Sequence, residues 1–296
     1  MSQTLEALTR RTATTRDIRG IVHTMKTLAA INAHPYEQAA HAIGGWRDSV
    51  LDGLRAFVKA HGALPHTADT DALPVVVAFG SDQGLCGNYN EIVAEALAVH
   101  PVARADPQIL AIGAQMRDAL EGAGMEVTAQ LLAPASAGGL NRLARELVAR
   151  IDAASTAAKR DIRVTLAFTE RAPHGHQDPV LHQILPLAPE LAESLSRRPW
   201  TSRSLPHFDL PPDAILSALL RNYLFAGLYR AAAEAMVTEN AERLARMTQA
   251  ENSIDDRLAE LDAATRTARQ SAITEELLDI SAGFEALRAR DHRSPA

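Results

Sequence analysis

The stretch from Ala268 to Leu287 reads ARQSAITEELLDISAGFEAL, and it closes a run from Asn240 to Arg290 whose only glycine is Gly283 and which contains no proline. Apolar or small side chains recur in this run at steps of three and four residues, the period of a helix that packs along one seam. A long helix with a narrow seam needs a partner along its length, which indicates a mechanical element and not a catalytic pocket. The seam residues are Leu244, Met247, Ile254, Leu258, Leu261, Ala268 and Ala272, and the stripe continues one residue out of phase through Ile273, Leu277, Ile280, Phe284 and Leu287.

Both ends of the chain are expected to be helical. The helical pattern of residues 213–290 corresponds to a length on the order of 110 Å, so this helix must protrude from any small domain. Residues 2–33 also follow a helical pattern, and a second helical stretch ends near Gly62. Pro35 predicts a kink or a restart between those two stretches, because proline removes a backbone hydrogen bond and clashes with the preceding turn. The apolar face of the first stretch consists of Ile18, Ile21, Val22, Met25, Leu28 and Ala29.

Between the terminal helices the apolar period changes to that of short strands alternating with helices. This alternation predicts a parallel sheet with helices on its faces, a Rossmann-like α/β domain. The simplest fold is an antiparallel two-helix coiled coil that carries the inserted domain at one end, with residues near Met25 beside the last third of the C-terminal helix. Polar, proline-containing linkers are expected at 63–73 and 185–212. The predicted regions are N-terminal shaft helices over 1–62, an α/β domain over 74–188 and a C-terminal shaft helix over 213–290. The predicted strands are 75–79, 109–112, 127–132, 164–168 and 184–187, and the predicted helices between them are 92–99, 116–120 and 140–151.

The most enzyme-like segment is the loop after the first strand. Its glycines form neither a dinucleotide-binding fingerprint nor a phosphate loop, so a tight turn is favoured over nucleotide binding. Ser81 is outside a nucleophile elbow and Cys86 has no assignable base, so a structural, buried or half-buried thiol is favoured. His174 and His176 could chelate a metal weakly, but solvated loop histidines are favoured. We therefore expect no catalytic residue, no cofactor and no metal.

Composition excludes further classes of function. A net charge of −6 gives no general attraction to nucleic acid or anionic lipid. The single cysteine fits a reducing compartment. No apolar run is long enough for a membrane helix, and the start of the chain does not have the pattern of a leader peptide. Arginines and acids on the last helix, from Arg243 to Glu276, are those expected of a solvated face.

Four segments in order resemble the gamma subunit of the F-type rotary ATP synthase. The last, ARQSAITEELLDISAGFEAL, is similar to the family's A-R-Q-A-x-I-T-Q-E-L-x-E-I-x-x-G-A-x-A-L. Leu219 to Tyr223 with Thr238 to Met247 resemble L-L-R-x-Y and S-E-x-A-A-R-M-x-A-M. Ser81 to Asn90 resemble S-D-R-G-L-C-G-x-x-N, and Asp17 to Ala30 resemble, more loosely, I-x-x-I-x-K-A-M-K-M-V-A-A.

The resemblance implies a non-catalytic rotor shaft. Its terminal helices would pair inside a ring of alpha and beta subunits, and its α/β domain would meet the epsilon subunit and the membrane c-ring. Ion flow, of protons or sodium, would be coupled to the beta catalytic sites, on the cytoplasmic face of a bacterial inner membrane without membrane insertion. Residues matching ring contacts are Met25, Lys26, Arg269, Gln270, Thr274, Glu276 and Asp279. Tyr223 matches the foot near the membrane ring, and Asp82, Gly84, Cys86 and Gly87 match the structural loop of the α/β domain.

Two departures from the family pattern suggest a divergent member, of an accessory type. The family's basic run after Ala30 is replaced by Ile31 to Pro35, and its A-T-x-N-A becomes Gln249 to Ser253. Two other classes of protein were weighed. One is a free-standing coiled-coil scaffold with a ligand-binding head, and the other is a nucleotide-dependent enzyme that uses the loop at Gly80 to Gly87.

Overall fold

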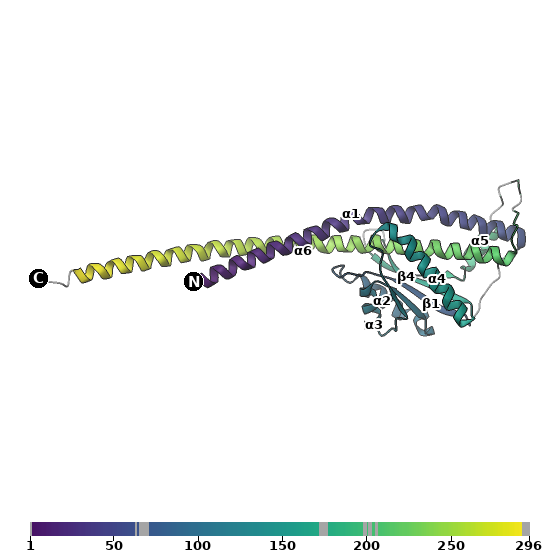
Figure 1. Ribbon diagram of the computed structural model, residues 1–296, viewed down its shortest axis with the longest axis horizontal. Coiled ribbons are helices and arrows are strands. Elements are labelled where there is room, and N and C mark those ends of the chain that lie inside the picture. Colours follow the sequence, from purple (N-terminus) through teal and green to yellow (C-terminus); the bar gives the residue numbers. More distant parts are fainter. Residues whose placement is uncertain are drawn as a thin grey trace. The chain divides into compact units, whose positions relative to one another are not determined.

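The computed structural model describes residues 2–62, 64, 71–171, 177–197, 200, 203–204 and 207–291, with side chains from 5 to 283 in these ranges. The chain divides into two compact units, a helical unit of Met1–Thr27 with Ala245–Ala296 and an α/β unit of Leu28–Leu244. The helices α1 (Ser2–His61) and α6 (Pro212–Asp291) contribute residues to both units (Figure 1). Long terminal helices with a central α/β sheet confirm the predicted fold class.

The α/β unit is built on a sheet of five strands in the order β3-β2-β1-β4-β5. The strands β1, β2, β3 and β4 are parallel, as the alternation of strands and helices predicted. The helices that connect them belong to the same unit. The strands are β1 (Leu73–Phe79), β2 (Gln108–Ile112), β3 (Ala129–Leu131), β4 (Ile162–Arg171) and β5 (Gln177–Leu185), and the connecting helices are α2 (Tyr89–Val99), α3 (Ala114–Gly122) and α4 (Leu140–Ala158), with short 3₁₀ turns at Pro101–Ala105 and Ala137–Gly139.

Alternate residues of the central strand β1 pack into two separate cores. Val76 and Ala78 lie in a core with side chains of α2 and α3. Val75, Val77 and Phe79 lie in the other core, with side chains of α4, α6 and the second half of α1. Because successive side chains of a strand point to opposite faces, the sheet is covered on both sides. The terminal helices therefore form part of one helical layer of the α/β unit.

The strand β5 corrects the expectation of a parallel sheet. It pairs antiparallel with β4, from Arg171 opposite Gln177 to Val164 opposite Leu185. The connection from Arg171 to Gln177 is too short for the crossover that a parallel strand needs, so the two strands form a hairpin. The predicted strand at 184–187 overlaps only the end of β5. The preceding residues of β5 form no apolar run, because they are mostly polar and half-buried or exposed.

Two prolines have effects that the sequence pattern did not predict. The helix α1 runs through Pro35 without a restart. Pro35 is exposed, so water can satisfy the carbonyl that it leaves unpaired, and the next side chain, Tyr36, is buried and donates a hydrogen bond to the Pro134 carbonyl at 2.7 Å. The predicted linker at 185–212 contains a helix, α5 (Pro189–Arg197), which Pro189 begins, the first position where proline is well tolerated.

In the helical unit, the first residues of α1 pair antiparallel with α6. Arg16 contacts Asp262, whereas Arg19, further along α1, contacts Asp255, earlier in α6. Along α6 the predicted seam is buried or half-buried at Met247, Ile254, Leu258, Leu261, Ala268 and Ala272. The chain therefore buries this stripe against its own N-terminal helix.

Candidate functional site

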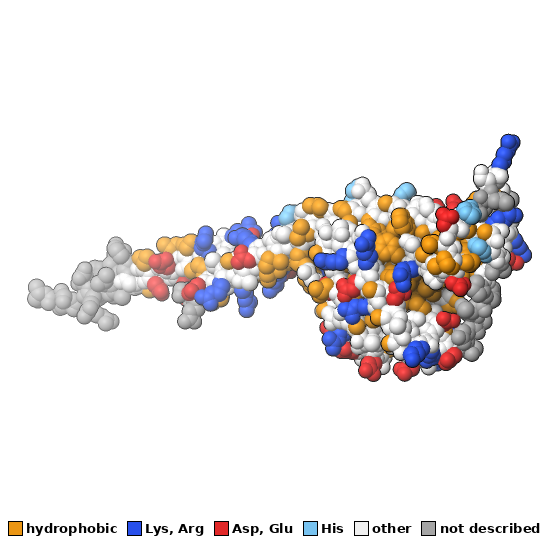
Figure 2. All heavy atoms as spheres, turned by 45° about the vertical axis from the view of Figure 1, so that its right-hand side comes forward, with side chains coloured by type: hydrophobic (Ala, Val, Ile, Leu, Met, Phe, Trp, Pro, Cys, Tyr) orange, Lys and Arg blue, Asp and Glu red, His pale blue; other side chains and the backbone are white. Residues whose placement is uncertain are grey.

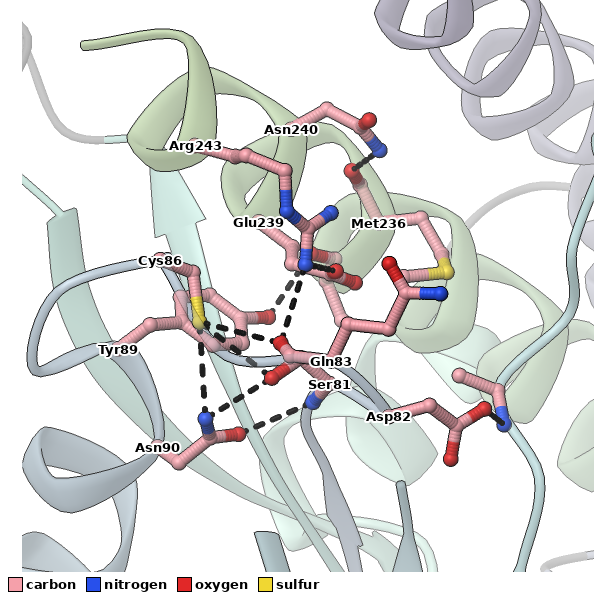
Figure 3. Close-up of polar contacts among 12 residues, drawn as sticks. Ser81, Asp82, Gln83, Cys86, Tyr89, Asn90, Met236, Glu239, Asn240 and Arg243 are labelled. Atoms are coloured by element: carbon pink, nitrogen blue, oxygen red, sulfur yellow. Dashed lines mark hydrogen bonds and ion pairs between the residues drawn. The ribbon is translucent and has the colours of Figure 1, made fainter. Parts of the chain in front are cut away.

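The loop after β1 is held by hydrogen bonds between its own residues and the start of α2. The Ser81 backbone N–H donates to Asn90 Oδ1 at 3.0 Å, and Asn90 Nδ2 donates to Ser81 Oγ at 2.9 Å (Figure 3). Ser81 Oγ also lies 3.4 Å from Cys86 Sγ. A Cβ at Gly80 would lie 2.4 Å from Asn90 Oδ1 and 2.5 Å from Met116 Cβ, so only glycine lets α2 and α3 pack this close to the loop. The Ser81 hydroxyl has no base beside it in this set.

Asp82 ties the loop to the next two elements of the sheet. Its Oδ1 accepts a hydrogen bond from the Ala114 N–H at the start of α3, at 3.1 Å, and its Oδ2 accepts one from the Ala133 N–H at 2.8 Å. A carboxylate at this place also complements the positive end of the helix dipole. Asp82 therefore has a structural role at the position where an α/β enzyme would bind a phosphate.

Two residues of the same loop have left-handed backbone angles. Gly87, with φ of 66°, occupies a conformation that glycine adopts at no steric cost. Leu85, with φ of 64°, does not have this freedom, and its side chain is 61% exposed. Gly84 is exposed, and a Cβ there would meet only Gln115 Oε1, at 3.8 Å. The loop thus presents an apolar side chain to solvent from a strained backbone.

A buried ion pair joins α6 to this loop. The Arg243 Nη2 atom lies 2.6 Å from Glu239 Oε1 and donates to the Gln83 carbonyl at 3.1 Å (Figure 3). The side chains of Arg243 and Glu239 are only 12% and 5% exposed. Burial raises the pKa of Glu239 to about 7, against the opposing effect of Arg243. Desolvation therefore outweighs the attraction between the partners. Among the described residues, Glu239 Oε2 and Arg243 Nε have no hydrogen-bond partner.

This loop makes structural contacts with α6, and its side chains do not form a reactive set. Burial raises the pKa of the Cys86 thiol, which keeps it in the less reactive protonated form. Tyr89 is buried and donates from its hydroxyl to the Ala235 carbonyl at 2.8 Å, which adds a second tie to α6. Within the described part of the chain, no group of histidine, cysteine and carboxylate side chains could hold a metal ion. His174 and His176, which were expected to be solvated loop histidines, lie outside that part.

In the helical unit, Glu251 contacts three basic side chains of α1. Its carboxylate lies 2.8 Å from Lys26 Nζ and 2.9 Å from His23 Nδ1, and Arg19 Nη2 is 3.9 Å away. Arg19 also binds Asp255 at 2.5 Å. The hydrogen bonds from Lys26 and His23 lower the pKa of Glu251 to about 2. These contacts fix the register of the two helices by charge as well as by the apolar seam.

The residues matched to ring contacts fall into two groups. The first, on the late part of α6, is exposed: Arg269, Gln270, Thr274, Glu276 and Asp279. The second, on α1, is half-buried: Met25 and Lys26, of which Lys26 is engaged by Glu251. The apolar stripe beyond Ala272 is also exposed where its side chains are described, at 51% for Ile273 and 62% for Leu277 and Ile280. Figure 2 shows orange side chains beside the grey end of this unit.

Tyr223, matched to the foot, is buried at 5% exposure in the core between α6 and the sheet.

Met25 was predicted to lie beside the last third of the C-terminal helix, and this is wrong. Its neighbour Lys26 contacts Glu251, which lies in the middle of α6.

Two charged groups important in the structure were missed from sequence. Arg243 was assigned to a solvated face, but it is buried with Glu239 against the loop. The i,i+4 spacing of Glu239 and Arg243 can be read from the sequence. Their burial cannot, because it results from contact with the loop of the α/β unit. Glu251 lies within the segment that departs from the family pattern, which was the one available signal.

The fold defines a class of protein in which paired terminal helices carry an inserted α/β unit. A family model described as ATP synthase matches residues 4–287. The ATP synthase gamma chain of Synechococcus sp. is 30% identical over 96% of this chain and 99% of its own length. That of Heliobacterium modesticaldum is 26% identical over 94% and 97%.

Solved structures share the fold. A chain from the assembly of Euglena gracilis mitochondrial ATP synthase that includes its c-ring aligns with a TM-score of 0.65 and 18% identity, over 100% of this chain and 98% of that chain. A chain from the rotor of the same enzyme gives a TM-score of 0.60 at 16% identity, over 92% and 100%. The chain belongs to the ATP synthase gamma-chain family and is a non-catalytic, central-stalk subunit.

Proposed function

We propose that this chain is the rotor shaft that couples ion flow through a membrane c-ring to conformational change in the beta catalytic sites of an F-type ATP synthase. The observation that carries the proposal is the helical unit, in which α1 and α6 bury a common seam and add the Glu251 ion pairs. Such a unit transmits torque, because turning one helix requires the other to follow. Its partners are alpha and beta subunits around the shaft, and the epsilon subunit and c-ring at the foot.

The late part of α6 provides the surface for the alpha and beta subunits. Arg269 and Gln270 are exposed, with Thr274 one helical turn further on. An arginine facing carboxylates would form charge-assisted hydrogen bonds of about 1.5–3 kcal/mol each, strong enough to bias a conformation yet weak enough to break as the shaft turns. Glu276 and Asp279 extend this face. Lys26 acts on the ring indirectly, since Glu251 holds its ammonium group in the coil.

At the foot, the buried Tyr223 supports the packing of α6 on the sheet and does not itself touch the c-ring. We place the complex on the cytoplasmic face of a bacterial inner membrane, with this subunit peripheral to it. The described helices include none that is long and apolar enough to cross a membrane. The driving ion, proton or sodium, is bound in the membrane ring, outside this chain.

The test is a pair of matched double variants in the reconstituted complex. Arg269→Ala with Gln270→Ala should leave the free chain folded by circular dichroism and lower rotation-coupled ATP turnover. Arg257→Ala with Asn252→Ala changes two exposed residues elsewhere on the same helix. This control should alter neither the circular dichroism of the free chain nor the ATP turnover of the complex. Full assembly with unchanged turnover in the first variant would show that Arg269 and Gln270 are an ordinary solvated face.

A further inference from the structure

Two adjoining cavities lie within the α/β unit, and the residues of the loop after β1 do not line them. The outer cavity, of about 370 Å³, lies between α1 and α6, where Ala40, Gly44 and Ala226 leave room between the helices. The inner cavity, of about 230 Å³, is lined mostly by apolar side chains of the β4–β5 hairpin and α6, together with Glu170 and His182. Arg47 and Arg230 line both cavities. The apolar lining of the inner cavity is Leu166, Phe168, Val180, Ile184, Tyr223 and Ala231.

Arg47 is the unusual group at this junction. Its side chain is half-buried, and it has no hydrogen bond or ion pair to any residue that the structure describes. Its charge reaches the inner cavity, because Arg47 is the strongest electrostatic influence, after burial, that lowers the pKa of His182 there. A guanidinium beside an apolar floor is normally paired with an oxyanion, since burying an unpaired charge is costly.

The other charged groups at the junction already have partners. Arg171 binds Glu37 at 2.7 Å. Arg230 lies 3.7 Å from Glu170 and 3.9 Å from Glu234. Burial raises the pKa of Glu234, and Arg230 opposes that effect. Among the described residues that line the two cavities, Arg47 is therefore the cation without a hydrogen bond or ion pair that could bind a ligand.

We propose that these cavities form a binding site for a small carboxylate with an apolar body, in which Arg47 binds the carboxylate and the inner cavity receives the body. A planar carboxylate matches the two parallel N–H groups of a guanidinium. The inner cavity is smaller than the roughly 300–1,000 Å³ of sites for drug-sized ligands, so the apolar body that it receives must be small. Since Arg47 comes from α1, Ile184 from β5 and Ala231 from α6, a bound ligand would fasten the two terminal helices to the sheet.

The probe is octanoate, added to the full-length chain labelled at its isoleucine δ1-methyl groups. Ile184 lines the inner cavity and Ile43 the outer one, whereas Ile151 is buried in α4 and serves as the internal control. Octanoate should shift the Ile184 and Ile43 signals saturably and leave Ile151 in place. Octan-1-ol, which lacks the carboxylate, should bind at least tenfold more weakly, and inorganic phosphate, which lacks the apolar body, should not shift Ile184.

Two variants separate the contributions of charge and volume. Arg47→Gln should weaken octanoate binding about tenfold or more, because a charge-assisted hydrogen bond is lost. Val180→Phe should weaken it by filling the inner cavity while Arg47 remains. Arg150→Gln, which changes an exposed arginine of α4, is the matched control and should bind as wild type. If Arg47→Gln fails to fold, Val180→Phe and the octan-1-ol comparison decide the question.

Absence of saturable shifts at Ile184, equal binding of octan-1-ol, or unchanged affinity in a folded Arg47→Gln variant would each overturn the proposal. These measurements use the free chain, so they do not depend on the rotor function.

Discussion

Replacing Glu239 by glutamine should change how the stability of the chain depends on pH. Glu239 is 4% exposed, and burial raises its pKa from the ordinary 4.5 to about 7. Its partner Arg243 would keep its hydrogen bond to the Gln83 carbonyl and could still donate a hydrogen bond to the oxygen of the new amide. The substitution therefore removes the titration while leaving the shape and most of the contacts in place.

The sign follows from the raised pKa. The folded chain holds a proton on Glu239 more tightly than the unfolded chain does, so this group favours folding below about pH 4.5. That contribution is lost as pH rises through about 7. A shift of about 2.5 units, at about 1.4 kcal/mol per unit, corresponds to about 3 kcal/mol. Between pH 4.5 and pH 8, the free energy of unfolding of Glu239→Gln should therefore rise by about 3 kcal/mol relative to that of wild type.

The assay is urea unfolding of the full-length chain at several pH values, for wild type and Glu239→Gln. The readout is how the difference between their free energies of unfolding changes with pH. A destabilisation that is the same at every pH, from the loss of the charged partner of Arg243, does not affect this slope. Glu146→Gln, which changes an exposed carboxylate of α4 paired with Arg150, is the control and should give a flat difference. A flat difference for Glu239→Gln as well would refute the reasoning that desolvation outweighs the ion pair.

Two further predictions concern the helical unit. Leu261→Asp should lower its stability by about 3–5 kcal/mol in thermal unfolding followed by circular dichroism, because Leu261 is 5% exposed in the seam and the new charge would have no partner. Leu277→Asp on the same helix, at a side chain 62% exposed, should leave the melting curve of the free chain unchanged, and equal melting of both variants would contradict the seam. Glu251→Gln should destabilise the unit at pH 7, and the difference should shrink below about pH 4.5 and vanish near pH 2, since the pKa of Glu251 is lowered to about 2 in the folded chain. Glu260→Gln is the exposed control, and a loss that persists unchanged at low pH would show that Glu251 acts by packing and not by charge.

The sequence by itself determined the helical ends and most of the sheet. The steps of three and four residues from Met247 to Ala272 mark the buried seam of α6, because a helix repeats its face with that period. The strands β1, β2 and β4 were found from their apolar runs, since strands of a sheet covered on both faces are apolar throughout. The loop after β1 was also readable as a tight turn that packs the following helix, and Asn90 of α2 does bond to Ser81 in it.

Only the tertiary structure decided the features that depend on contacts between distant segments. The antiparallel strand β5 is partly polar and is defined by pairing with β4, and α1 continues through Pro35 because that proline faces solvent. Glu239 and Arg243 have the spacing of a solvated helix pair, and it is the loop at Gln83 that buries them. Lys26 meets Glu251 because the register between two helices is set by all their contacts together, and no local pattern encodes it.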